Sequence, residues 1–153
     1  MEHPRICCFT GHRKIYNDPT VVSKLRRQIR VLAESGCRTF RAGGAMGFDM
    51  MAALCVLELR EELGLRLELY LPCRNQADKW SSREKSFYNH ILSSADSIEY
   101  VHEAYTRSCM YDRNRRMVDG ADVCVAYLKH SSGGTAYTVN YAHQKNVKVI
   151  NIA

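Results

Sequence analysis

Several features that mark other classes of protein are missing from this chain of 153 residues. No apolar run is long enough to cross a membrane, and no signal-peptide core stands at the N-terminus. Proline is scarce, with three residues, and no repeat or low-complexity segment interrupts the chain. These absences favour a single domain over residues 1–153, in the cytoplasm and without a membrane segment.

Paired metal ligands and paired cysteines are also missing. The seven cysteines include no C-x-x-C pair, and the six histidines show no metal-ligand spacing. An odd number of scattered cysteines is typical of reduced, cytosolic thiols rather than of disulfides or a zinc site. We therefore expect no metal and no cofactor.

Two common signatures of nucleotide-binding sites are absent as well. The chain has neither the G-x-G-x-x-G fingerprint of dinucleotide sites nor the G-K-[ST] of a P-loop. A standard NAD site and P-loop ATP hydrolysis are thus excluded. The net charge of +6 still points to an anionic partner.

What the sequence does contain is a regular alternation of strand and helix patterns. Strands are expected over 5–10, 37–42, 67–71, 97–101, 121–128 and 147–152, and helices between them. Asp18 is expected to cap the first helix, Gly36 to end it, and Ser81 with Glu84 to form a capping box. This alternation predicts an α/β fold: a single Rossmann-like domain with a mainly parallel sheet and helices on both faces.

Three turns are expected at the carboxyl ends of strands, where ligands bind in such sheets. They are 10–13 after the first strand, 43–47 after the second and 131–135 after the fifth, and a sheet ordered 3-2-1-4-5-6 brings them to one crevice. The last two are rich in glycine and precede helices, whose first N–H groups attract anions. We therefore predict a phosphate-bearing ligand held between the glycine turns.

Further side chains near these turns suit such a ligand. Arg113 and Asn114 lie on the helix before strand five, and a guanidinium matches a phosphate or a carboxylate. Asp49 either caps its helix or meets a ribose hydroxyl. Tyr111 either stacks on a base or packs against the protein, and the methionines are interpreted as core residues. The predicted ligand-binding residues are Thr10, Gly11, His12, Arg13, Gly43, Gly44, Ala45, Met46, Gly47, Asp49, Arg113, Asn114, Ser132, Gly133, Gly134 and Thr135.

The order of these motifs resembles the SLOG superfamily, which joins the DNA-processing protein A (Smf) domain with the LOG "lysine decarboxylase-like" proteins. The resemblance rests on G-G-A-M-G at 43–47, M-Y-D-R-N at 110–114, A-D-V at 121–123 and S-G-G-T at 132–135. With F-T-G-H-R at 9–13, the chain looks closest to a branch of small stand-alone bacterial and phage members. The resemblance implies a pocket for a nucleotide or a nucleotide-derived ligand.

The functions of these relatives leave several alternatives. The first is a sensor or sequestering module for a signalling nucleotide, such as an ADP-ribose derivative or a cyclic nucleotide, in antiphage defence. The second is a LOG-type phosphoribohydrolase, although Thr138 stands where the family signature has glutamate. The third, ranked lower, is single-stranded DNA binding. The resemblance also implies a homodimer.

Overall fold

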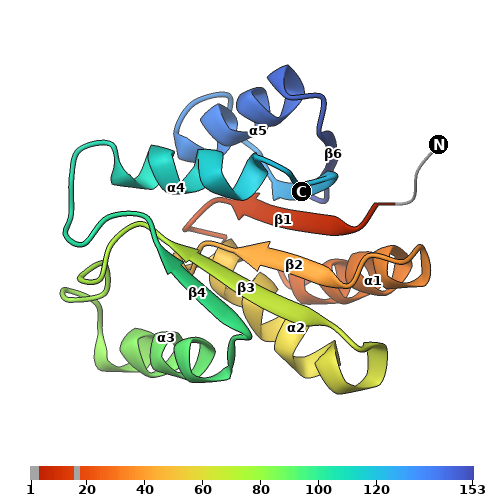
Figure 1. Ribbon diagram of the computed structural model, residues 1–153, viewed down its shortest axis with the longest axis horizontal. Coiled ribbons are helices and arrows are strands. Elements are labelled where there is room, and N and C mark those ends of the chain that lie inside the picture. The colour runs from red at the N-terminus through yellow and green to blue at the C-terminus, as the bar shows by residue number, and fades with distance from the viewer. Residues whose placement is uncertain (1–3, 16–17) are drawn as a thin grey trace.

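Six strands and five helices alternate along the part of the chain that the computed structural model describes, residues 4–15 and 18–153 (Figure 1). Residues 1–3, part of the N-terminal segment considered for a signal peptide, lie outside that description. The elements are β1 (Ile6–Gly11), α1 (Val21–Glu34), β2 (Thr39–Ala42), α2 (Phe48–Leu63), β3 (Arg66–Leu71), α3 (Ser82–Ser94), β4 (Ser97–Tyr100), α4 (Cys109–Val118), β5 (Val123–Tyr127), α5 (Gly134–Gln144) and β6 (Lys148–Asn151).

All five strand pairings in this sheet are parallel, in the order β4-β3-β2-β1-β5-β6. Helices α1, α2 and α3 cover one face, and α4 and α5 cover the other (Figure 1). The predicted Rossmann-like α/β architecture is thereby confirmed. The larger core packs against α1 and α2, and a smaller core of residues such as Met117 and Ala142 packs beneath α4 and α5.

Strand β4 lies at an outer edge next to β3, so the expected order 3-2-1-4-5-6 is wrong. Ile98 on β4 is 39% exposed, as suits an edge strand, whereas every residue of β5 is buried. Strand β5 therefore pairs directly with β1, and Thr10 stands opposite Ala126. This places the loop after β1 and the loop after β5 at adjacent strand ends.

Some helix ends follow local sequence signals, and the start of α1 does not. Gly36 has a φ of +101° just beyond α1, and Ser81 and Glu84 form the expected capping box on α3. Asp18 is not the N-cap of α1, because the helix starts at Val21 after Thr20. Its carboxylate instead accepts hydrogen bonds from the Thr20 hydroxyl at 2.6 Å and from the Tyr127 hydroxyl at 2.7 Å. The Asp18 carboxylate therefore contacts Thr20 and β5 rather than the first amides of α1.

Candidate functional site

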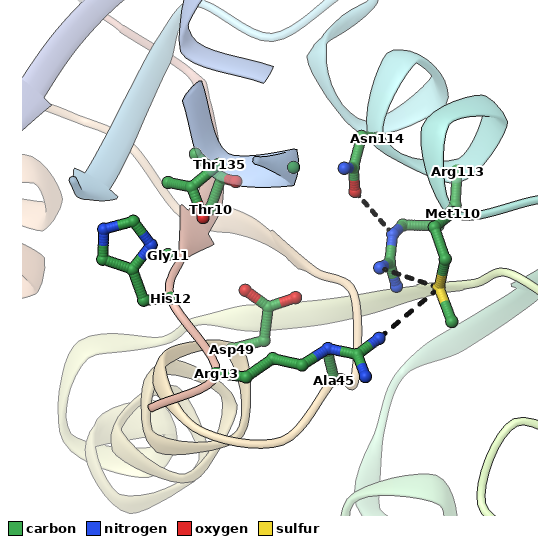
Figure 2. A pocket seen from close by; sticks show the side chains of 11 residues that line it. Thr10, Gly11, His12, Arg13, Ala45, Asp49, Met110, Arg113, Asn114 and Thr135 are labelled. Carbon is green, nitrogen blue, oxygen red and sulfur yellow. Dashed lines mark hydrogen bonds between the residues drawn. The ribbon is translucent and has the colours of Figure 1, made fainter. Parts of the chain in front are cut away.

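A cleft of about 230 Å³ opens at the carboxyl ends of β1 and β5, between the first turns of α2, α4 and α5 (Figure 2). It lies where the strand order reverses, the usual ligand position in open α/β sheets. The residues that line it are Thr10, Gly11, His12, Arg13, Ala45, Asp49, Met110, Arg113, Asn114, Gly134 and Thr135. Ten of these eleven belong to the set predicted from the sequence.

Arg113 forms the buried wall of the cleft. Its side chain projects from α4 and is 4% exposed, and burial lowers the pKa of its guanidinium while Asp49 raises it. Nη1 donates to the carbonyl oxygens of Gly43 and Tyr70, and Nε donates to Oδ1 of Asn114 at 2.7 Å. Arg113 thus ties α4 to the ends of β2 and β3 and holds a cation in the cleft.

Asp49 is the carboxylate of the cleft, and it points into the space near Thr10 and Thr135 in Figure 2. It is 5% exposed, and the backbone amides that it faces, those of Gly43 and Ala45, precede α2 rather than belong to its first turn. Burial raises its pKa from 3.8 to about 6, while Arg113, Arg13 and the amides of Ala45 and Gly43 act in the opposite direction. Of the two roles considered for Asp49, capping is therefore wrong.

The first glycine turn does not present free amides to a ligand as expected. The amides of Gly43 and Ala45 face the Asp49 carboxylate, and the Phe48 amide donates to the His12 carbonyl at 3.2 Å. A Cβ on Gly43 would lie 2.5 Å from Nη1 of Arg113 and 2.7 Å from Oδ2 of Asp49. The turn therefore holds the two charged side chains in place, and only Ala45 of its residues lines the cleft.

Arg13 is exposed at the mouth of the cleft and reaches across it. Its Nη2 lies 3.8 Å from Sδ of Met110, and Nη2 of Arg113 approaches the same sulfur at 3.7 Å (Figure 2). Among the described residues, no carboxylate oxygen lies within 4.0 Å of a nitrogen of either guanidinium, so neither arginine forms an ion pair there. With one carboxylate against two guanidinium groups, the cleft carries a net positive charge.

The start of α5 closes the cleft on the β5 side. Its N-cap is Gly133, with a φ of +95°, and no described side chain caps the helix. The amides of the first turn have no partner within the helix and are oriented toward its N-terminal end. Thr138 lies one turn further on and donates its hydroxyl to the Gly134 carbonyl at 2.9 Å, away from the cleft lining.

Six predicted residues lie outside the lining, and one lining residue was missed. Gly43, Gly44 and Gly47 support the first turn from behind, Met46 lines a separate apolar groove, and Ser132 and Gly133 are exposed next to the cleft. The missed residue is Met110, which the sequence interpretation assigned to the core. Its spacing of three and four residues from Arg113 and Asn114 places all three on one helix face.

The other residues considered from the sequence lie elsewhere. Tyr111 is 42% exposed and packs edge-to-face on Tyr137, with ring centroids 4.6 Å apart. Asp112 is engaged by His102 at 2.7 Å and Arg115 at 2.6 Å, outside the cleft. All seven cysteines are free and buried. Within residues 4–15 and 18–153, no three His, Cys, Asp or Glu side chains group as metal ligands.

A protein-family model described as the YspA SLOG family matches residues 7–152. This chain belongs to that family. The SLOG resemblance drawn from the sequence motifs is therefore confirmed over almost the whole chain. None of the helices in the described part combines the length and the apolar character needed to cross a bilayer.

Members of small bacterial protein families are among the relatives of this YspA SLOG protein. A UPF0398 protein of Bacillus pumilus (strain SAFR-032) is 28% identical over 126 residues, which are 80% of this chain and 68% of the relative. The uncharacterized SPbeta prophage-derived protein YoqJ of Bacillus subtilis (strain 168) is 30% identical over 116 residues, 67% of this chain and 68% of that protein.

Solved structures show the same fold at lower sequence identity. DNA processing protein A from Helicobacter pylori, described as binding single-stranded DNA, matches with a TM-score of 0.67 and 17% identity over 96% of this chain and 64% of that one. The Streptococcus pneumoniae protein of the same name matches with a TM-score of 0.68 and 17% identity over 95% of this chain and 49% of that one. This chain spans less than two thirds of either protein.

Proposed function

We propose that this SLOG protein binds a phosphorylated, nucleotide-derived ligand in the cleft between β1 and β5. The observation that carries the proposal is the convergence of Arg13, Arg113 and the uncapped start of α5 on one space that holds a single carboxylate. Two cations and the partial positive charge of a helix N-terminus attract an anion together. The buried Asp49 adds an acceptor for a hydroxyl group.

The volume of the cleft indicates which part of the ligand it encloses. At about 230 Å³ it is smaller than the roughly 300–1,000 Å³ of pockets that enclose a whole drug-sized ligand. A ribose phosphate suits this smaller volume. Its phosphate would contact Arg13 and the first amides of α5, and a ribose hydroxyl would contact Asp49. The base then lies at the mouth of the cleft, next to the exposed Arg13.

Arg13 provides the sharpest test because it is exposed and has no carboxylate partner among the described residues. Arg13→Gln is expected to weaken nucleotide binding about tenfold or more, since a hydrogen bond to a charged group is worth about 1.5–3 kcal/mol. Its unfolding temperature without ligand should stay unchanged. A thermal-shift screen with nucleoside monophosphates, ADP-ribose and cyclic dinucleotides measures both, because a ligand at 100 times its Kd adds about 2.7 kcal/mol of stability.

Arg27→Gln is the matched control, because Arg27 is an exposed arginine on α1 far from the cleft lining. No ligand-induced shift from any of these compounds, or equal losses in both variants, would contradict the proposal. Oligo(dT) forms a separate arm of the screen, because the Helicobacter pylori neighbour is described as binding single-stranded DNA. Salt-sensitive binding of oligo(dT) without a response to mononucleotides would favour that function instead.

A second candidate, a nucleotide N-glycosidase, is favoured by the buried carboxylate in the cleft. Thr138, at the position of the family glutamate, bonds to Gly134 and carries no charge. In this candidate reaction the Asp49 carboxylate, which lines the cleft, stabilises the oxocarbenium-like state as water replaces the base at the ribose C1′ carbon. The reaction consumes water and releases the free base and ribose 5-phosphate.

Asp49→Asn tests the enzyme and the electrostatics together. With a native pKa of about 6 against 3.8, the wild type loses up to about 3 kcal/mol of stability as the pH rises from 4 through 6. The sign follows because the folded state retains a proton that the unfolded state has released. The variant should lack this loss in pH-dependent urea unfolding.

If the protein is an N-glycosidase, base release by the wild type should rise through pH 6 and disappear in Asp49→Asn. Base release retained in the variant would remove Asp49 from the chemistry.

The biological setting of this proposal follows the family. We infer a cytoplasmic homodimer that senses or sequesters a signalling nucleotide, for example in antiphage defence. Size-exclusion chromatography with light scattering measures the oligomeric state directly. A monomer at micromolar concentration would contradict the dimer, whereas the cleft assignment is tested separately by Arg13→Gln.

A further inference from the structure

A hydrogen bond from a side chain joins the two loops that border the cleft. Nε2 of His12, in the loop after β1, accepts the backbone N–H of Lys129, in the loop after β5, at 2.8 Å. The His12 ring also packs on the ring of His130, with centroids 4.7 Å apart and planes inclined by 34°. Between Lys129 and the start of α5, residues 131–133 are exposed. His12 is thus a direct link between the Arg13 side of the cleft and the segment that leads to the α5 amides.

We propose that His12 is a positioning residue whose neutral ring holds the β5–α5 loop, and with it the anion-binding start of α5, opposite Arg13. The inference rests on the proposed function, because it assigns the role of this link to ligand binding. It also predicts the tautomer of the ring. Since Nε2 accepts a hydrogen bond, the proton of neutral His12 resides on Nδ1.

Protonation of His12 breaks this link for two reasons. The imidazolium has no acceptor, so the bond from the Lys129 amide is lost. The new charge also stands beside the Lys129 ammonium and His130. Burial, followed by His130 and Lys129, already lowers the His12 pKa from its usual 6.5. The link is therefore intact at neutral pH and is lost as the pH falls below 6.5, through the lowered pKa of the folded protein.

The other charged groups around His12 set the conditions of the test. Tyr127 packs edge-on against the ring from β5, and its hydroxyl bonds to Asp18. Arg13 follows His12 in the chain, and Asp49 lines the cleft from α2 (Figure 2). Asp49 titrates near pH 6 and, once protonated, favours anions, which opposes the effect of His12. The binding measurements therefore belong in an Asp49→Asn background.

Nuclear magnetic resonance detects the link without any ligand. The ¹⁵N shifts of the His12 ring should show Nδ1–H at pH 7.5, and the Lys129 amide should shift with the same titration as His12. In His12→Gln, whose amide oxygen can replace Nε2 as acceptor, the Lys129 amide should not titrate. A neutral ring protonated on Nε2, or a Lys129 amide that is insensitive to the His12 titration, would overturn the proposal.

ADP-ribose is the binding probe, because its diphosphate keeps a constant charge between pH 5 and 8. In the Asp49→Asn background its affinity should fall about two- to tenfold from pH 7.5 to pH 5, the factor expected for one net hydrogen bond. With His12→Gln added, that pH dependence should vanish, whereas His130→Ala should retain it. A pH dependence that persists in the His12→Gln protein would refute the positioning role. If ADP-ribose binds at no pH, the ligand class proposed above fails for this probe, while the Lys129 amide still decides the link.

Discussion

Replacing Arg113 with methionine is expected to lower the free energy of unfolding by about 3 kcal/mol or more. The guanidinium is 4% exposed and donates to the carbonyl oxygens of Gly43 and Tyr70 and to Asn114. Methionine fills much of the space but leaves these acceptors without donors, at about 1–3 kcal/mol for each one that stays buried. It also leaves the Asp49 carboxylate without its strongest cationic neighbour. Urea unfolding at pH 7.5 measures the loss.

Arg115→Met is the matched control on the same helix. The Arg115 side chain is 43% exposed, bonds to Asp112 at 2.6 Å and to the Tyr137 hydroxyl at 3.1 Å, and lies outside the cleft lining. An exposed ion pair of this kind is worth about 1 kcal/mol or less. Similar losses in the two variants would show that the buried network around Arg113 contributes little.

Arg113→Lys separates binding from stability if Arg113→Met does not fold. The lysine keeps the positive charge but has no forked guanidinium to reach Gly43, Tyr70 and Asn114 together. We expect intermediate stability, and weaker nucleotide binding than in the wild type even where the variant is fully folded. Wild-type affinity in folded Arg113→Lys would mean that only the charge of this residue serves the ligand.

Gly47→Ala is expected to be comparably damaging, although it adds a single methyl group. Gly47 is the N-cap of α2 with φ +81° and ψ −126°, a backbone conformation that residues with a side chain rarely adopt. A Cβ there would lie 2.6 Å from the carbonyl carbon and 2.7 Å from Cα of Arg13. Backbone strain of about 1–3 kcal/mol adds to the cost of moving the loop after β1. We expect a loss of about 3 kcal/mol or more in urea unfolding.

The same variant should also lose ligand affinity, because the displaced backbone carries His12 and Arg13. Gly64→Ala separates the two contributions, since Gly64 also has a positive φ, +66°, but a Cβ at this position would have no neighbouring atom within 4 Å. That control should lose only about 1 kcal/mol, the ordinary cost of alanine in place of glycine in the left-handed region. Equal losses at both positions would mean that the close approach of Arg13 to α2 is unimportant.

Local patterns were sufficient for most of the fold. Of the apolar stripe that helical spacing predicts for α1, Leu25, Ile29 and Leu32 are buried and Val22 is partly buried against the core. The continuous apolar runs of β1 and β5 lie inside the sheet. The order of the strands was not recoverable in the same way. Strand β4 is short and has few apolar residues, so its sequence does not say where in the sheet it lies. Its pairing with β3 assigns it to the edge.

The candidate site was also only partly predictable from the sequence. Strand-end turns indicated where the cleft lies, because parallel strands end at one edge and their loops gather there. Asp49 was ambiguous in the sequence, since its position in the first turn of a helix suits a cap as well as a ligand contact. In the structure its carboxylate faces the amides of Gly43 and Ala45 instead of the first amides of α2, and its burial raises its pKa.

The sequence by itself determined the class of the fold, the edge of the sheet where the cleft lies and the arginines that give this cleft its excess of positive charge. These properties depend on periodicity, on glycine positions and on residue types close together in the chain. Only the tertiary structure decided which strand pairs with β1, that the first glycine turn surrounds Asp49, and that His12 bonds to Lys129 across 117 positions. Such contacts depend on how distant segments pack, and local residue patterns carry no record of that packing.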